Sequence, residues 1–223
     1  MKKQDYSNRS HMHPTYRINN GLIVPGVTSI TGILGFATEQ LIYWGWDLGI
    51  QGIDYKVFRR ELADIGTLTH KMIINHFYGK ETDTKEYSHT IIDTAENSLI
   101  KFYEWEKNHE LEPIFLEKSF VSEKHKFGGT LDFYGYVDKK LTLADFKTGT
   151  RIYEDNFIQL AGYELLLNEA NHKIERRMIL HLPRDEREGY REFSRPDLIA
   201  ETIIFLTAKR IYDIKKILDK RRK

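Results

Sequence analysis

Cysteine is absent from this 223-residue chain, and that absence excludes several kinds of site at once. Disulfide bonds, thiolate zinc sites and iron–sulfur clusters all need cysteine. The chain also lacks the run of roughly 18 apolar residues that a membrane-spanning helix needs. The lysines at its start are not followed by the apolar stretch of a signal peptide. We therefore expect a soluble, cytoplasmic protein with no membrane segment and no iron–sulfur cluster.

The chain also has no large excess of positive or negative residues. The sequence has 34 Lys and Arg against 33 Asp and Glu, a formal charge of +1. The net charge therefore gives no argument for nucleic-acid binding. It does not exclude it either, because a basic groove and an acidic metal site in one protein would also sum to a net charge near zero. The hydrophobic content of 40% is typical of a globular protein.

Neither internal repeats nor low-complexity linkers divide the sequence. Residues 1–14 are polar and are predicted to form a mobile tail, and residues 15–223 are predicted to form one domain. Within it, residues 15–110 are expected to be a hairpin followed by helices, and residues 111–223 an α/β core. The predicted fold class is α/β, a small mixed sheet of four or five strands flanked by helices, with helical N-terminal embellishment.

The spacing of hydrophobic residues and the positions of turn-forming residues predict where the strands and helices lie. Strands are predicted at residues 114–122, 130–137, 141–146, 176–182 and 190–193, with a turn at 123–129. Helices are predicted to begin at Thr28 or Ser29, Asp54, Ser88, Asp155 or Asn156, and Ser194. The first of these is expected to end near Gly35. The last is expected to bury one side through Leu198, Ile203, Leu206, Ile211, Ile214 and Leu218.

Three polar residues stand out in the predicted core. Asp132 and Asp145 lie on two strands joined by a short turn, so their carboxylates can converge. Lys147 is two residues beyond Asp145, and the alternation of side chains along a strand puts both on one face. Ordinary surface carboxylates and an edge-strand lysine are the alternative reading, but aspartate is depleted in strands.

That combination suits phosphodiester hydrolysis. A divalent cation can neutralise phosphate charge and lower the pKa of a bound water, and Mg²⁺ prefers oxygen ligands. A nearby ammonium can orient the nucleophile and stabilise developing negative charge.

The ordered motifs Gly128-Gly-Thr-Leu-Asp132, Asp145-Phe-Lys147-Thr148 and Gln159-x-x-x-Tyr163 resemble the PD-(D/E)xK nuclease superfamily. The upstream Gly66-Thr-Leu-Thr-His70 resembles the Gly-x-x-x-His helix of its RecB-like exonuclease branch, which includes the mitochondrial genome maintenance exonuclease and phage homologues. The resemblance covers roughly residues 16 to 165. Without cysteine, the branch members that bind an iron–sulfur cluster are disfavoured.

The resemblance implies a restriction-endonuclease-like core and a role for each matching residue. Asp132, Asp145 and the backbone carbonyl of Phe146 would hold Mg²⁺ or Mn²⁺, with His70 completing the metal shell or lining the phosphate. Lys147 would position or help deprotonate the attacking water. Gln159 and Tyr163 would orient Lys147 and contact the DNA backbone. Thr148 and, more loosely, Glu117 join them on the substrate side.

We therefore expect a metal-dependent DNA exonuclease acting on ends with single-stranded character, in replication, recombination or repair. An endonuclease on the same fold and a catalytically inactive DNA-binding protein are the alternatives. The oligomeric state stays open. Tyr43, Trp44 and Trp46 form an aromatic cluster that could stack on unpaired bases, although such a cluster beside a helix is more often core.

Overall fold

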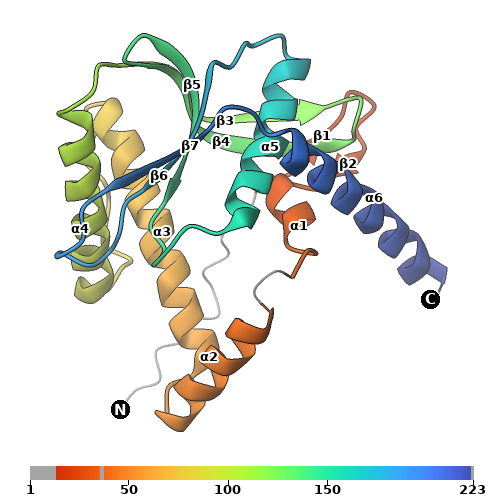
Figure 1. Cartoon of the computed structure of the whole chain (residues 1–223). Helices are drawn as coiled ribbons and strands as arrows, with labels where there is room; N and C mark the ends of the chain where they lie inside the picture. The colour runs from red at the N-terminus through yellow and green to blue at the C-terminus, as the bar shows by residue number, and fades with distance from the viewer. Residues whose placement is uncertain (1–13, 36–37, 222–223) are drawn as a thin grey trace.

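The computed structural model describes residues 14–35 and 38–221 (Figure 1). The predicted mobile tail therefore lies outside the described residues, except for Pro14. The N-terminal part contains β1 (Tyr16–Arg17), β2 (Ile23–Val24), α1 (Val27–Thr31), α2 (Thr38–Ile50), α3 (Tyr55–Phe77) and α4 (His89–Glu106). The remainder contains β3 (Leu111–Ser122), β4 (Phe127–Val137), β5 (Lys140–Lys147), α5 (Glu154–Glu169), β6 (Arg176–His181), β7 (Arg191–Arg195) and α6 (Ile199–Arg221).

The main sheet has five strands in the order β3-β4-β5-β6-β7. Neighbouring strands are antiparallel except β5 and β6, which are parallel. A parallel pair needs a long crossover, and α5 supplies it. The prediction of a small mixed sheet flanked by helices is confirmed, as a restriction-endonuclease-like core requires.

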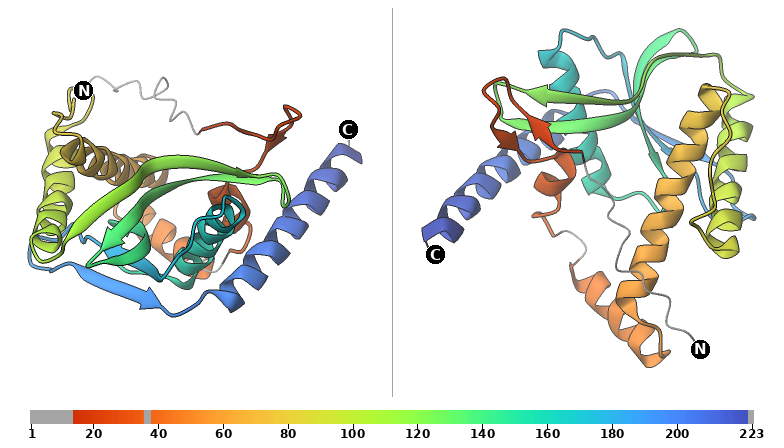
Figure 2. Two further views of the ribbon diagram at one scale, coloured as in Figure 1. Left: turned by 90° about the horizontal axis from the view of Figure 1, so that it is seen from above. Right: turned by 180° about the vertical axis from the view of Figure 1, so that it is seen from behind.

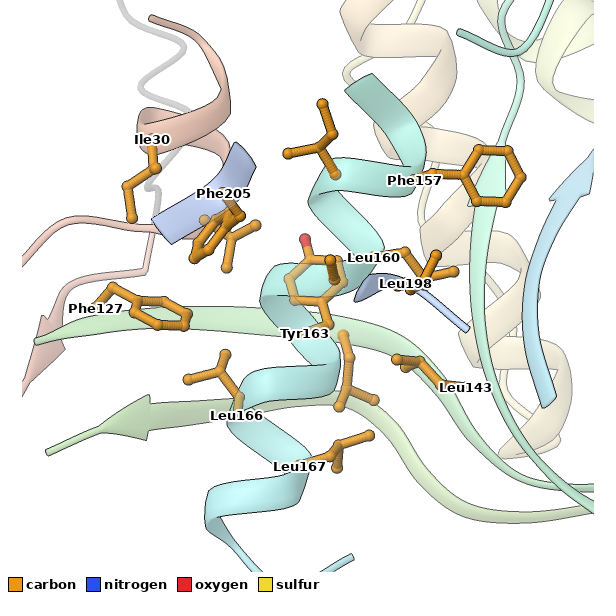
Figure 3. Packing of buried hydrophobic residues seen from close by; sticks show 14 of the residues in the cluster. Ile30, Phe127, Leu143, Phe157, Leu160, Tyr163, Leu166, Leu167, Leu198 and Phe205 are labelled. Atoms are coloured by element: carbon orange, nitrogen blue, oxygen red, sulfur yellow. The ribbon is translucent and has the colours of Figure 1, made fainter. Parts of the chain in front are cut away.

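Helices cover both faces of this sheet, with α3 and α4 on one side and α1, α5 and α6 on the other (Figures 1 and 2). Buried side chains alternate along β5: Leu143 joins the cluster under α5, whereas Ala144 and Phe146 join the cluster under α3 and α4. Strands buried on both faces are expected where helices lie on both sides. Figure 3 shows the cluster around α5, with Tyr163 between Leu160 and Leu166.

Two predicted helix starts are confirmed by their caps. The Asp54 side chain accepts hydrogen bonds from the main-chain N–H groups of Lys56 (2.8 Å) and Val57 (3.3 Å), so α3 begins at Tyr55. Ser88 likewise accepts from the N–H of Ile91 at 3.4 Å and starts α4. Among the described residues, no helix has both the length and the apolar character needed to cross a membrane.

The predicted turn at residues 123–129 is wrong at its end, because β4 already begins at Phe127. The glycines there serve close packing rather than a turn. A Cβ on Gly128 would lie 2.3 Å from Cγ of Tyr16, and one on Gly129 would lie 2.8 Å from both Tyr163 and Val27. The N-terminal hairpin can therefore rest directly on β4. The strand before it is also longer than predicted, since β3 begins at Leu111.

Three predicted helix boundaries need smaller corrections. Neither Thr28 nor Ser29 caps α1, which follows Gly26 without a side-chain cap and ends at Thr31 instead of near Gly35. The crossover helix α5 begins at Glu154, with Tyr153 at its N-cap position, one residue before the earlier of the two predicted starts.

The C-terminal helix differs most from expectation. It begins at Ile199, because Ser194 and Arg195 still pair with β6 as part of β7. Its inward side is made by Leu198, just before the helix, and by Phe205 and Ala208. Four of the predicted buried positions are exposed: Ile203, Ile211, Ile214 and Leu218. For the last three the reason is visible in Figures 1 and 2, where the end of α6 projects past the sheet.

Candidate active site

The two aspartates lie on neighbouring strands, as predicted. The β4–β5 register pairs Phe133 with Ala144, so Asp132 and Asp145 are the next residues along their strands. Oδ2 of Asp132 accepts a 2.8 Å hydrogen bond from the main-chain N–H of Phe146. The end of β5 therefore holds the Asp132 carboxylate in place.

Lys147 shares a face of β5 with Asp145. Its Nζ lies 2.7 Å from Oδ2 of Asp145, whose side chain is only 2% exposed, while that of Lys147 is 23% exposed. The ammonium thus lies between an enclosed carboxylate and the opening to solvent.

His70 reaches the same point from α3. Its Nδ1 lies 3.3 Å from Oδ1 of Asp132, and its Nε2 lies 3.0 Å from the carbonyl oxygen of Phe146. A carbonyl oxygen only accepts, so Nε2 carries a proton in this arrangement. The structure thus brings the histidine of the upstream Gly-x-x-x-His motif to Asp132 and to the end of β5, while its place in the metal shell stays a prediction. Both ring nitrogens face oxygen atoms that were predicted to bind the metal.

Gln159 and Tyr163 approach from α5, one helical turn apart. Nζ of Lys147 donates to Oε1 of Gln159 at 3.1 Å, and Nε2 of Gln159 donates to Oη of Tyr163 at 2.8 Å. Because an ammonium only donates, the amide oxygen of Gln159 must face it, which leaves the amide nitrogen for Tyr163. These two hydrogen bonds orient Lys147. Tyr163 itself is 5% exposed, so its hydroxyl serves the site from inside.

Glu117 and Thr148 complete the predicted set in different ways. Glu117 is exposed on β3, between the paired residues Leu116 and Lys118, and its φ of 47° lies in the left-handed region. Partial burial of its carboxyl group raises the pKa of Glu117, and the charge of Asp132 raises it further. Thr148 is buried, and its Oγ1 accepts from Nη2 of Arg184 at 3.1 Å.

Charges in the site are strongly coupled. Burial, reinforced by the neighbouring Asp132 carboxylate, raises the pKa of Asp145 to about 6 despite the opposing ammonium of Lys147. Burial also acts to raise the pKa of Asp132, but the charge and hydrogen bond of His70 outweigh it and lower that pKa.

The other groups respond to the two carboxylates. Burial lowers the pKa of both Lys147 and His70, yet Asp145 and Asp132 reverse the sign, so both pKa values are raised. Burial, with the same two carboxylates, raises the pKa of Tyr163 well above its ordinary value. The two carboxylates therefore favour the protonated, cationic forms of Lys147 and His70 in spite of burial.

The residues present suit a hard divalent cation. Asp132, Asp145 and the Phe146 carbonyl offer oxygen ligands, which Mg²⁺ and Mn²⁺ prefer. Oδ2 of Asp145 is enclosed and, apart from its ion pair with Lys147, makes no hydrogen bond. Within residues 14–35 and 38–221, no three His, Cys, Asp or Glu side chains are already arranged around one metal position. The donor set fits by chemistry.

Sequence reasoning missed one supporting residue. His181 is 1% exposed at the end of β6, opposite Lys147 in the parallel register, and its Nε2 lies 2.7 Å from the carbonyl oxygen of Gly149. It anchors the loop that follows Lys147. A histidine at the end of the predicted neighbouring strand was the available signal.

The aromatic cluster of α2 is divided by the structure. Trp44 packs against Tyr55 and Phe58, with ring centroids 5.3 and 5.8 Å apart, so it is a packing residue. Tyr43 is 71% exposed and Trp46 is 66% exposed. Of the three cluster residues, Tyr43 and Trp46 are the ones that present their rings to solvent.

Comparisons with known proteins add little to this geometry. No family model matches the chain. No curated protein matches it either. Among solved structures, it is similar to an alkaline exonuclease (LHK-Exo) from Laribacter hongkongensis, at 14% identity and a TM-score of 0.37, covering 72% of this chain and 88% of that one.

Two further structures have the same 14% identity. LHK-Exo in complex with dAMP has a TM-score of 0.36 and covers 73% of this chain and 89% of that one. SSO0001 has a TM-score of 0.36 and covers 83% of this chain and 88% of that one. At these values the likeness says nothing about what the present chain binds or does.

Proposed function

We propose that this chain is a Mg²⁺- or Mn²⁺-dependent deoxyribonuclease of the RecB-like branch, an exonuclease acting on DNA ends with single-stranded character. One observation carries the proposal: Asp132, Asp145 and Lys147 meet at the end of β5, and His70 and Gln159 reach the same point from α3 and α5. Five polar residues from four elements converge there, which an ordinary surface ion pair does not require.

Each residue has a task in hydrolysis. Asp132, Asp145 and the Phe146 carbonyl would hold the metal, which when bound supplies phosphate charge neutralisation and a bound water of lowered pKa. Lys147, held by Gln159, places a positive charge where negative charge develops on the phosphate. His70 keeps Asp132 and the Phe146 carbonyl oriented toward one point. Burial of Tyr163 and Asp145 keeps bulk water away from the far side of the site.

Labelled oligonucleotides test the proposal directly. Single-stranded and duplex DNA labelled at the 5′ or 3′ end should be degraded in Mg²⁺, while circular single-stranded DNA should survive. Cutting of the circle would instead favour an endonuclease on the same fold. Metal-independent DNA binding without cleavage in Mn²⁺ would identify an inactive DNA-binding protein.

The control is Lys147→Ala, compared with wild type by circular dichroism and thermal melting. Loss of the ammonium should slow cleavage by about 100-fold or more. A folded Lys147→Ala protein with wild-type activity would sink the assignment. The proposed setting is DNA replication, recombination or repair in the cytoplasm.

A further inference from the structure

Arg184 lies immediately beside the site but belongs to none of the predicted motifs. It follows β6, and its Nη2 donates to the main-chain carbonyl of Leu62 on α3 at 2.8 Å and to Oγ1 of Thr148 at 3.1 Å. Thr148 is the residue after Lys147. The guanidinium therefore lies in the angle between α3 and the end of β5, next to the proposed catalytic lysine.

The main chain that carries Arg184 is fixed from two sides. The main-chain N–H of Leu182 donates to the carbonyl of Lys147 at 2.8 Å. From α4, Ser98 donates to the carbonyl of Pro183 and Asn97 to that of Arg184, both at 3.4 Å. A side chain mounted on such a backbone loses little freedom when it binds a ligand.

Arg184 has no counter-ion among the described residues. Both of its bonds go to neutral oxygens, its Nε is enclosed without a hydrogen-bond partner, and no described residue accepts from Nη1. Burial lowers the pKa of Arg184, with no carboxylate to oppose the effect. The other arginines of the same loop region differ: Arg187 is paired with Asp185, and Arg191 with Glu188. A half-buried cation without an anion is costly unless a ligand supplies one.

Gly66 leaves room beside this cation. A Cβ at that position of α3 would lie 3.5 Å from Oγ1 of Thr148 and 3.9 Å from Nη2 of Arg184. These are ordinary contact distances, so alanine would fit, but its methyl group would cover the guanidinium. Glycine inside a helix costs roughly 0.5–1 kcal/mol relative to alanine, which is a reason to look for a function in the missing methyl group.

We propose that Arg184, with Gly66 and Thr148, forms a binding site for a backbone phosphate of the substrate strand next to the scissile one. The guanidinium suits this ligand because Nη2 is used by Leu62 and Thr148, while the two N–H groups of Nη1 have no acceptor among the described residues and can donate to phosphate oxygens. The site holds the strand and takes no part in bond cleavage. Arg184 is thus a positioning residue, and this inference rests on the proposed nuclease function.

Salt dependence separates phosphate binding from a merely structural role. Each phosphate contact to a single strand contributes a slope of about −0.7 to log K against log salt. Cleavage of a labelled single-stranded oligonucleotide in Mg²⁺ should be measured over a KCl series for wild type, Arg184→Lys and Arg184→Met. Arg184→Met should raise KM roughly tenfold or more with little change in kcat, and should reduce the salt slope of kcat/KM by about 0.7. Arg184→Lys keeps the charge and should keep the slope.

Three matched variants complete the test. Thr148→Val removes the hydrogen bond but not the cation, so its slope should equal that of wild type. Arg187→Met removes an arginine that is already neutralised by Asp185 and should also leave the slope unchanged. Gly66→Ala should raise the melting temperature while raising KM, because the methyl group stabilises the helix and covers the guanidinium.

The inference is overturned if Arg184→Met and Arg184→Lys both keep the wild-type slope, whatever their melting temperatures. It is also overturned if Gly66→Ala leaves KM unchanged. An active wild-type enzyme with either result removes only the phosphate site. A wild-type protein that neither binds nor cleaves DNA removes the proposed function, and this inference with it.

Discussion

The main-chain N–H of Phe146 on β5 donates a 2.8 Å hydrogen bond to the Asp132 carboxylate on β4. Phe146 lies between Asp145 and Lys147, so one three-residue segment supplies a carboxylate and an ammonium and also fixes the second carboxylate. A group held by the backbone needs little reorganisation when a ligand or transition state forms. The site therefore depends on the register of β4 against β5 as much as on its side chains.

The hydrogen bonds that link Lys147 to Gln159 and Gln159 to Tyr163 predict unequal effects for substitutions of Gln159 and Tyr163. Gln159 bonds Lys147 directly at 3.1 Å, whereas Tyr163 reaches Lys147 only through Gln159. We expect Gln159→Ala to lower kcat about 10- to 100-fold and Tyr163→Phe to lower it less than Gln159→Ala does. Kinetics of both single variants and the double variant measure this.

Because Tyr163 acts on Lys147 only through Gln159, the effects of the two single substitutions on kcat do not add. The double variant should be no slower than Gln159→Ala alone, because Tyr163 has nothing left to orient. Effects that multiplied would show instead that Tyr163 acts on the substrate by its own route.

The left-handed backbone of Glu117 predicts a conflict between stability and function. Its φ of 47° is unfavourable for any residue with a Cβ, at a cost of about 1 kcal/mol or more. Glu117→Gly relieves this strain and Glu117→Ala does not. The glycine variant should therefore be the more stable of the two in urea unfolding, by up to about 1 kcal/mol, because the strain that it relieves exceeds the extra chain entropy that glycine loses on folding.

Both variants lose the same carboxylate beside Asp132, so cleavage should fall equally in the two. Equal stabilities would show that the backbone at residue 117 is unstrained. Equal, undiminished rates would remove Glu117 from the site.

A surface carboxylate outside the site gives a pH prediction. Burial acts to raise the pKa of Glu169, but donation from the Ser122 hydroxyl and the main-chain N–H of Lys124 outweighs it, so the pKa is lowered from its ordinary 4.5. A depressed pKa means that the ionised form stabilises the fold. That contribution is complete above pH 4.5 and is lost as the pH falls through the lower folded-state pKa.

Glu169→Gln keeps the acceptor oxygen and removes the charge. Because the group is exposed, its stability at pH 7 should fall by less than about 1 kcal/mol. Urea unfolding at pH 7, 5 and 3.5 should show the gap between the two proteins narrowing toward the lowest value. A gap of constant size would mean that the charge of Glu169 does not contribute.

The core of the site was predictable because it is local. Asp132, Asp145 and Lys147 lie on two strands joined by a tight turn, where strand alternation alone decides which side chains meet. Gln159 and Tyr163 follow from helical spacing in the next element. His70 is distant in sequence, and only the family motif pointed to it; nothing in the spacing of α3 specifies that this helix crosses the end of β5.

Other features needed tertiary packing to be decided. Gly128 and Gly129 suggest a turn when read alone, yet they lie in β4 because Tyr16, Val27 and Tyr163 pack against them. The apolar stripe of α6 is typical of a buried face, but the sheet ends before the stripe does. Arg184 follows no motif, and the proposal for it depends on its having no paired carboxylate in the described part of the chain, which a sequence does not show.

The last prediction concerns the bulge that brings Glu117 opposite Asp132. The β3–β4 register shifts between Pro113 and Phe115, and Gly135 lies across from that shift. A Cβ on Gly135 would lie 2.3 Å from the main-chain oxygen of Glu112 and 2.8 Å from Cα of Pro113, and neither backbone atom can move cheaply. Gly135→Ala should therefore destabilise the fold by about 2–3 kcal/mol in urea unfolding.

Gly189→Ala is the matched control, because a Cβ on Gly189 would meet nothing within 4 Å; it should change stability by less than about 0.5 kcal/mol. The stronger consequence is for the site. If the chain escapes the clash by sliding β3 along β4, Glu117 moves away from Asp132 while Asp145 and Lys147 stay in place. Residual activity of Gly135→Ala, measured well below its melting temperature, should then match that of Glu117→Ala, and wild-type activity there would show that the bulge does not position Glu117.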